Sequence, residues 1–100
     1  MQSENIRYLP IAEDDLAEIV DYLLEYSTSA ANAFIDELEN LEAQLSAFPE
    51  AAPLVRNKSL RHKGYRMAVI GEYLLFYILR DECVYVMRII HTKRNYLSLL

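Results

Sequence analysis

Three runs rich in β-forming residues, separated by short polar breaks, constrain the fold of this chain more than any other feature. The runs are Tyr65–Ile70, Tyr73–Leu79 and Cys83–Ile90, and they are dominated by Val, Ile, Leu, Tyr and Phe. Such residues fit the pleated, half-buried surface of a sheet. The breaks, Gly71-Glu72 and Arg80-Asp81-Glu82, are short enough for hairpin turns. The pattern therefore predicts a three-stranded antiparallel meander.

The first half of the chain predicts a short strand followed by two helices. Apolar and polar residues alternate over Asn5–Leu9, and Pro10 ends the run, which is typical of an edge strand of the later sheet. Apolar residues then recur with helical spacing over Ala12–Tyr26 and over Ala30–Phe48. The link Ser27-Thr28-Ser29 is short, so we expect an antiparallel helix hairpin.

The length of 100 residues allows one domain with one core, spanning residues 1–100. We expect an α+β fold in which the helices pack on one face of the sheet. The other face should be an open, mostly apolar surface of the kind that binds a protein partner. Strict alternation along the third run predicts that Val84, Val86, Arg88 and Ile90 share one face.

Cellular location is constrained by three sequence features. The polar start has no basic region followed by an apolar one, so no signal peptide is expected. The longest apolar run, Tyr73–Leu79, is too short to span a bilayer. The single cysteine, Cys83, has no partner for an internal disulfide and fits a reducing compartment. These features predict a cytoplasmic protein.

The charge of the chain is divided unequally between its halves. The net charge is −5, but residues 1–50 contain one basic and twelve acidic residues, whereas residues 51–100 contain nine basic and three acidic residues. Such asymmetry indicates either a basic face for an acidic partner or polyanion, or simply well-solvated acidic helices. Both interpretations stay open at this point.

Motifs for phosphate loops, dinucleotide sites and zinc sites are absent from the sequence, so we expect neither cofactor nor metal. What remains is a set of basic and polar side chains around the β-rich runs. Such groups can hold a phosphodiester and move protons, which would permit metal-independent RNA cleavage, or they can form structural ion pairs. The candidates are Arg66, Arg88, His91, Arg94 and Tyr96, with Arg61, Lys63 and Lys93 as further binding residues.

The order and spacing of these pieces resemble the RelE/ParE superfamily of type II toxin–antitoxin toxins, also called plasmid stabilisation proteins. The best-matched pieces are Gly64-Tyr65-Arg66, Gly71-Glu72-Tyr73, Phe76-Tyr77, Arg88-Ile89-Ile90-His91 and Arg94-Asn95-Tyr96-Leu97. The resemblance covers nearly the whole chain. It implies an α+β toxin that inhibits growth and is neutralised by a cognate antitoxin.

The resemblance implies two functional branches. RelE-like members cut mRNA on the ribosome, whereas ParE-like members inhibit DNA gyrase. RelE-like chains commonly carry an arginine in the middle strand where this chain has Leu74, and ribosome-dependent nucleases tend to be basic, whereas this chain is acidic. Both departures favour the ParE-like branch, with the five candidates Arg66, Arg88, His91, Arg94 and Tyr96 carried over as toxicity residues.

Three hypotheses therefore compete: a ParE-like gyrase inhibitor, a RelE-like endoribonuclease, and an inactive relative that only binds an antitoxin or forms a homodimer. All three predict a partner. We expect an antitoxin segment that is acidic and apolar, and that covers a common face carrying Arg66 and Arg88.

Overall fold

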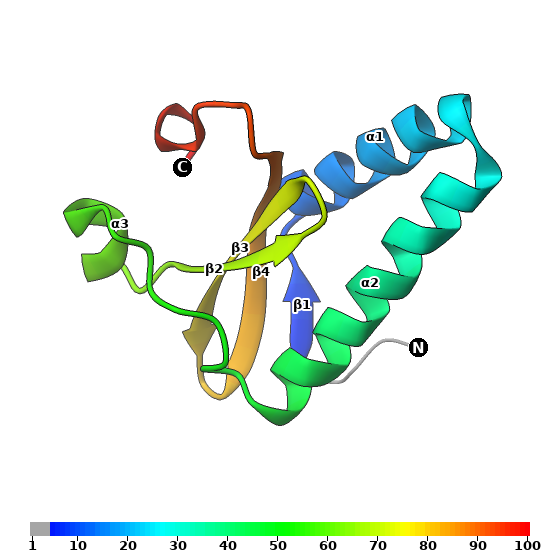
Figure 1. Ribbon diagram of the computed structural model, residues 1–100. Helices are drawn as coiled ribbons and strands as arrows, with labels where there is room; N and C mark the ends of the chain where they lie inside the picture. Colours follow the sequence, from blue (N-terminus) through cyan, green and yellow to red (C-terminus); the bar gives the residue numbers. More distant parts are fainter. Residues whose placement is uncertain (1–4) are drawn as a thin grey trace.

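The computed structural model of the chain describes residues 5–100 and contains a mixed sheet with helices on both of its faces (Figure 1). The elements follow one another as β1 (Ile6–Tyr8), α1 (Pro10–Tyr26), α2 (Thr28–Ala47), α3 (Lys58–His62), β2 (Arg66–Ile70), β3 (Tyr73–Arg80), β4 (Cys83–His91) and the 3-10 turn η1 (Tyr96–Ser98). The predicted α+β fold is confirmed, and α3 and η1 are additions to it.

The four strands lie in the order β1-β4-β3-β2. Strands β2, β3 and β4 form the predicted antiparallel meander. β1 joins the sheet as the predicted edge strand and runs parallel to β4, with Ile6 opposite Val84 and Tyr8 opposite Val86. Because β1 has three residues and β4 has nine, a large part of the β4 edge lies beyond the reach of β1.

Helices α1 and α2 form the predicted hairpin and cover one face of the sheet (Figure 1). α1 begins at Pro10, two residues earlier than expected, because a proline at the first helical position lacks only an N–H that would have no partner in the helix. α2 begins at Thr28, so Ser27 alone links the two helices. The Ser27 hydroxyl accepts a hydrogen bond from the Ala30 N–H at 2.9 Å and caps α2.

A β-bulge in β4 interrupts the alternation of its side chains. Phe76 of β3 pairs with Arg88, but the next residue, Tyr77, pairs with Val86, so the register skips Met87. One additional residue on a strand shifts every later side chain to the opposite face, because the side-chain period of a strand is two.

The bulge makes the predicted common face of the third strand wrong. Val84 and Val86 lie in the core beneath the helix hairpin, and after the bulge it is Ile89 that continues this core. Ile90 belongs to the separate core on the opposite face. Arg88, which pairs with Phe76 of that same opposite core, is therefore on the face away from the helix hairpin.

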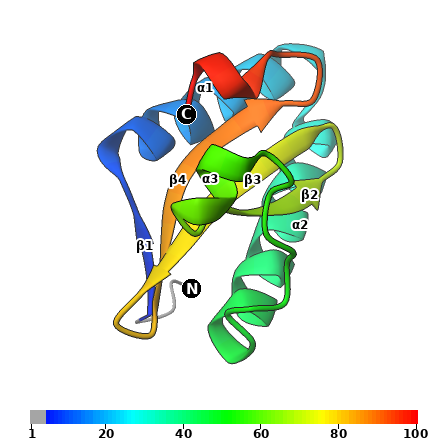
Figure 2. The same ribbon diagram turned by 90° about the vertical axis from the view of Figure 1, so that its left-hand side faces the viewer.

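The face of the sheet opposite the helix hairpin is partly covered by the chain itself. α3 and the C-terminal segment lie across it (Figure 2). Val55 and Leu60 from this side form a second core with Phe76 and Ile90, and Tyr96 packs against it. The prediction that this face is open is therefore wrong where α3 and the C-terminal segment cover it, because the segment between α2 and β2 returns onto the sheet.

A hollow of about 300 Å³ is lined by Leu9, Ile78, Arg80, Tyr85 and Met87.

Candidate functional site

The guanidinium of Arg88 is held inside the molecule by α1. Its Nε donates to Asp15 Oδ2 at 2.7 Å and its Nη2 donates to Asp15 Oδ1 at 2.9 Å, which makes the pair bidentate. Its Nη1 donates to the Leu99 carbonyl at 3.3 Å. The hydrogen bonds to Asp15 raise the pKa of Arg88, outweighing burial, which lowers it. All three guanidinium nitrogens therefore have partners within the chain.

Asp15 also binds the edge of β4 where β1 ends. The Leu9 N–H donates to the Val86 carbonyl at 3.0 Å, and the chain then turns into α1. Further along β4, the Ile89 N–H donates to Asp15 Oδ2 at 3.0 Å. A buried backbone donor without a partner is costly, so this carboxylate takes the place of a neighbouring strand. Asp15 thereby joins α1 to β4 through both a side chain and the backbone.

Arg66 lies at the start of β2 and shares the helix-hairpin face with its register partner Tyr77. Its Nη1 donates to the Ala52 carbonyl at 2.7 Å, and its Nη2 approaches Glu50 Oε1 at 3.4 Å. The Tyr77 hydroxyl donates to the Pro49 carbonyl at 2.8 Å. This group of contacts holds the segment after α2 against the sheet.

The predicted site residues do not converge on one place. Arg66 and Arg88 lie on opposite faces of the sheet, so the expected common Arg66/Arg88 face does not exist. Along the strands, Arg66 is level with Tyr77 in the middle of β3, whereas His91 is level with Tyr73, the first residue of β3. Because a strand rises about 3.3 Å per residue, these two positions are roughly 13 Å apart along the sheet, too far for both side chains to contact one phosphodiester.

His91 and Arg94 form the part of the predicted set that stays together. His91 ends β4, and its ring packs edge-on against Tyr73 with 5.1 Å between centroids. Its Nδ1 accepts a hydrogen bond from the Lys93 N–H at 3.1 Å. His91 and Arg94 both line a hollow of about 320 Å³ beside Asp15 and α1. These two side chains, with the exposed Lys93 between them, are the accessible remainder of the predicted site.

The other predicted residues are placed apart from this pair. The Tyr96 ring packs on Phe76 with 4.9 Å between centroids and contributes to the second core. Arg61 and Lys63 are exposed, at the end of α3 and directly after it. Tyr96 is therefore mainly a packing residue here, and the two basic residues belong to the covered side of the sheet.

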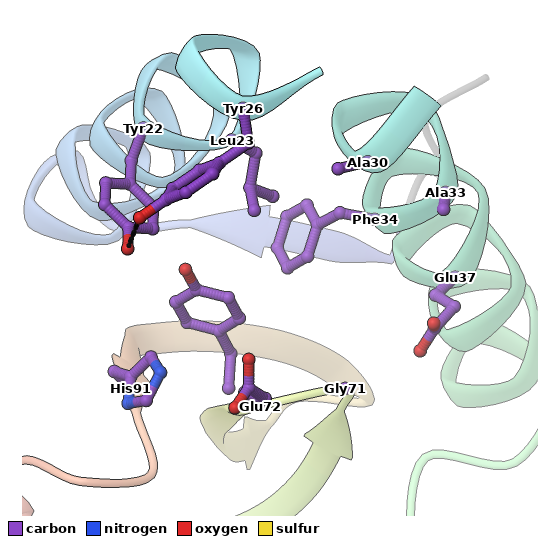
Figure 3. A pocket seen from close by; sticks show the side chains of 11 residues that line it. Tyr22, Leu23, Tyr26, Ala30, Ala33, Phe34, Glu37, Gly71, Glu72 and His91 are labelled. Carbon is purple, nitrogen blue, oxygen red and sulfur yellow. Dashed lines mark hydrogen bonds between the residues drawn. The ribbon is translucent and has the colours of Figure 1, made fainter. Parts of the chain in front are cut away.

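A groove that the sequence did not predict lies between the tip of the helix hairpin and the β2–β3 turn (Figure 3). We call it the aromatic groove; its volume is about 490 Å³. Tyr22 and Tyr26 face it from α1, where their rings meet edge-on at 5.1 Å and their hydroxyls share a hydrogen bond of 2.9 Å. Its lining residues are Tyr22, Leu23, Tyr26, Ala30, Ala33, Phe34, Glu37, Gly71, Glu72, Tyr73 and His91.

A signal for this groove is present in the sequence. Tyr22 and Tyr26 are four residues apart and lie outside the apolar stripe of α1, so they form an aromatic pair that the helix core does not need. Asp15 gave no comparable signal, because it is one of several acidic residues near the start of the same helix.

Two further features of residues 5–100 bear on the chemistry. No group of three or more His, Cys, Asp or Glu side chains in this range is arranged to hold a metal ion. Within the same range, no helix is both long and apolar enough to cross a membrane.

Comparison with known proteins gives a family. The sequence model of the protein family described as the ParE toxin of type II toxin–antitoxin systems (parDE) matches residues 6–96. A chain from the solved chromosomal ParDE TA system of P. aeruginosa has the same fold, with a TM-score of 0.62 and 17% identity, covering 91% of this chain and 96% of that chain. No curated protein sequence matches significantly. Because the family model spans nearly the whole chain, this protein belongs to the ParE toxin family of type II toxin–antitoxin systems.

Proposed function

We propose that this ParE-family toxin inhibits growth by binding DNA gyrase and that a cognate antitoxin neutralises it. The observation that carries the choice of a binding mechanism is the separation of Arg66 and Arg88 on opposite faces of the sheet. RNA cleavage requires a proton acceptor, a proton donor and a phosphate-binding cation within hydrogen-bonding distance of one phosphate.

The contacts of the individual side chains support this choice. Arg88 makes a half-buried bidentate pair with Asp15, so its charge is already neutralised. Tyr96 packs on Phe76. The net charge of −5 also disfavours approach to an RNA-rich surface. Binding to a protein target needs no convergent acid, base and cation.

An endoribonuclease is the second candidate, and one observation favours it. His91 and Arg94 line the same hollow, with Lys93 exposed between them. An imidazole and two cations at the end of a strand are a minimal set for proton transfer and phosphate binding. The two functions differ in which cellular process stops first.

The test is pulse labelling after expression of this chain alone in a bacterium, combined with a supercoiling assay on purified gyrase. The gyrase mechanism predicts that thymidine incorporation falls before methionine incorporation and that supercoiling is inhibited. An earlier fall in methionine incorporation, with cleaved mRNA, would establish the nuclease instead. If neither falls, the chain is an inactive relative that only binds its partner.

Arg94→Ala is the informative substitution for toxicity. Arg94 is exposed, so its loss should leave the fold intact and reduce growth inhibition. Arg88→Ala is less informative, because it leaves the half-buried carboxylate of Asp15 without its cation. Arg56→Ala, an exposed arginine in the connector, is the matched control and should leave growth inhibition unchanged.

A further inference from the structure

The aromatic groove exposes more aromatic surface than a folded monomer needs to. Tyr26 is 70% exposed and Tyr22 is 49% exposed. Opposite them, Phe34 packs edge-on against Tyr73 at 5.4 Å, and Tyr73 continues to the His91 ring. A concave, aromatic and partly exposed surface of this kind marks a site of interaction with a partner.

The charge of the groove is negative. Glu37 on α2 and Glu72 in the β2–β3 turn line it, and among residues 5–100 neither carboxylate forms a hydrogen bond or an ion pair. The pKa of Tyr22 is raised, first by its hydrogen bond to Tyr26 and to a smaller degree by Glu72. The pKa of Tyr73 is raised by burial and then by Glu72. The charge of Glu72 thus reaches both rings.

Aromatic faces combined with uncompensated carboxylates favour an organic cation. The negative face of a tyrosine or phenylalanine ring attracts a guanidinium or an ammonium group, and a nearby carboxylate adds a charge-assisted hydrogen bond. The apolar residues Leu23 and Ala33 in the same lining leave room for aliphatic neighbours. The groove therefore fits a basic side chain flanked by apolar ones.

The groove adjoins the hollow that contains the accessible basic residues. Tyr22, Tyr73 and His91 line both. A chain segment seated in the groove can continue past His91 and cover Arg94. This continuity points to a neutralising partner, because the same segment would cover residues on which toxicity is expected to depend.

We propose that the aromatic groove receives a segment of the antitoxin in which an Arg or Lys side chain is flanked by apolar residues. The cation sits against the rings of Tyr22 and Tyr26 and is neutralised by Glu72, while Glu37 adds negative charge from the α2 side of the groove (Figure 3). This inference rests on the proposed neutralisation by an antitoxin and specifies its chemistry. It replaces the acidic segment expected from the sequence, which was assigned to a face that the fold does not have.

The experiment measures binding of the cognate antitoxin by titration calorimetry, using the full toxin chain. Tyr26→Ala should weaken binding about tenfold, and Glu37→Gln combined with Glu72→Gln should weaken it by a similar factor. Tyr26→Phe keeps the ring and should bind like the unchanged toxin. Replacement of the anchoring Arg or Lys of the antitoxin by Gln should weaken binding by the same factor and should show little additional loss with the double Gln variant.

The matched control changes two acidic residues at the other end of the molecule. Asp81→Asn combined with Glu82→Gln, in the β3–β4 turn, removes the same two charges as the groove variant. Asp81 has a φ of 53°, which asparagine tolerates. The antitoxin should bind this control variant as tightly as it binds the unchanged toxin at each salt concentration used. Equal weakening by the control and the groove variant would overturn the proposal, because net charge would then explain both.

The outcomes separate this inference from the proposed function. If the antitoxin binds and all groove variants bind as tightly as the unchanged toxin, the groove is not its site, although neutralisation stands. If Tyr26→Ala weakens antitoxin binding but Glu37→Gln combined with Glu72→Gln does not, the bound segment is apolar and the basic anchor is refuted. If no complex forms with the folded toxin, neutralisation and this inference both fail, whatever the supercoiling assay shows.

Discussion

Arg66 on β2 and Arg88 on β4 are two arginines of similar exposure whose ion pairs contribute very differently to the stability of the fold. The side chains of Arg88 and its partner Asp15 are 14% and 11% exposed, and their closest contact is 2.7 Å. The side chain of Arg66 is similarly buried at 16%, but its partner Glu50 is 78% exposed and lies 3.4 Å away. The burial of the partner, more than that of the arginine, decides how strongly each ion pair matters.

The difference follows from what each carboxylate replaces. Asp15 accepts from the guanidinium and also from the Ile89 N–H, so it completes the hydrogen bonding of a strand edge. Glu50 adds a long contact to a guanidinium that already donates to the Ala52 carbonyl. The contact at Arg88 is therefore structural, and the stabilising group near Arg66 is the buried Tyr77 rather than the ion pair.

The largest effect is expected for Asp15→Ala. It leaves the half-buried guanidinium of Arg88 and the Ile89 N–H without their acceptor, and the free energy of unfolding should fall by about 2–4 kcal/mol. Urea unfolding at neutral pH measures this. The double variant Asp15→Leu with Arg88→Met should recover only part of the loss, because no unpaired charge remains but the Ile89 N–H still lacks its acceptor. A loss below about 1 kcal/mol for Asp15→Ala would contradict the assigned role.

Tyr77→Phe should have an intermediate effect. The hydroxyl donates to the Pro49 carbonyl and accepts from the Ala52 N–H at 3.3 Å, so its removal should cost about 1–2 kcal/mol at neutral pH. Burial raises the pKa of Tyr77, so the folded state retains a proton that the unfolded chain releases.

The same substitution should change the alkaline behaviour. The contribution of Tyr77 is complete below about pH 10 and declines as the pH rises further, because only the unfolded chain gains from ionisation there. The difference in stability between the unchanged protein and Tyr77→Phe should therefore narrow above about pH 10. Urea unfolding of both proteins from about pH 8 to about pH 11, which brackets the ordinary tyrosine pKa, measures this difference. A constant difference would show that the hydroxyl is not buried in solution.

The smallest effect is expected for Glu50→Ala. Because the carboxylate is 78% exposed and the contact is long, its removal should change the free energy of unfolding by no more than about 0.5 kcal/mol. Added salt should leave the result unchanged within error. A loss comparable to that of Asp15→Ala would show that exposure of the partner is not what separates the two arginines.

The parts of the fold that sequence predicted are those with local causes. The β-rich runs and their short breaks predicted β2, β3 and β4, and the helical periodicity predicted α1 and α2. The errors at helix ends are small and come from caps: Pro10 and Ser27 each extend a helix beyond its apolar stripe. Val55 and Leu60, apolar residues in the segment between α2 and β2, are buried in the second core.

The candidate site was predicted less well, because its arrangement depends on non-local contacts. The basic residues were identified by type, but their expected convergence assumed that β4 alternates without interruption. The skipped residue, Met87, breaks this assumption and separates Arg66 from Arg88. The partner of Arg88 was also unpredictable, since Asp15 is 73 residues away in the sequence.

The sequence by itself determined the fold class, the order of strands and helices along the chain, and the resemblance to the toxin family, because hydrophobic periodicity and turn residues act over short distances. Only the tertiary structure decided which face each arginine occupies, that the chain covers part of its own sheet, and that Tyr22 and Tyr73 meet at one groove. These features depend on strand register and on packing between distant segments, where a shift of one residue reverses the outcome.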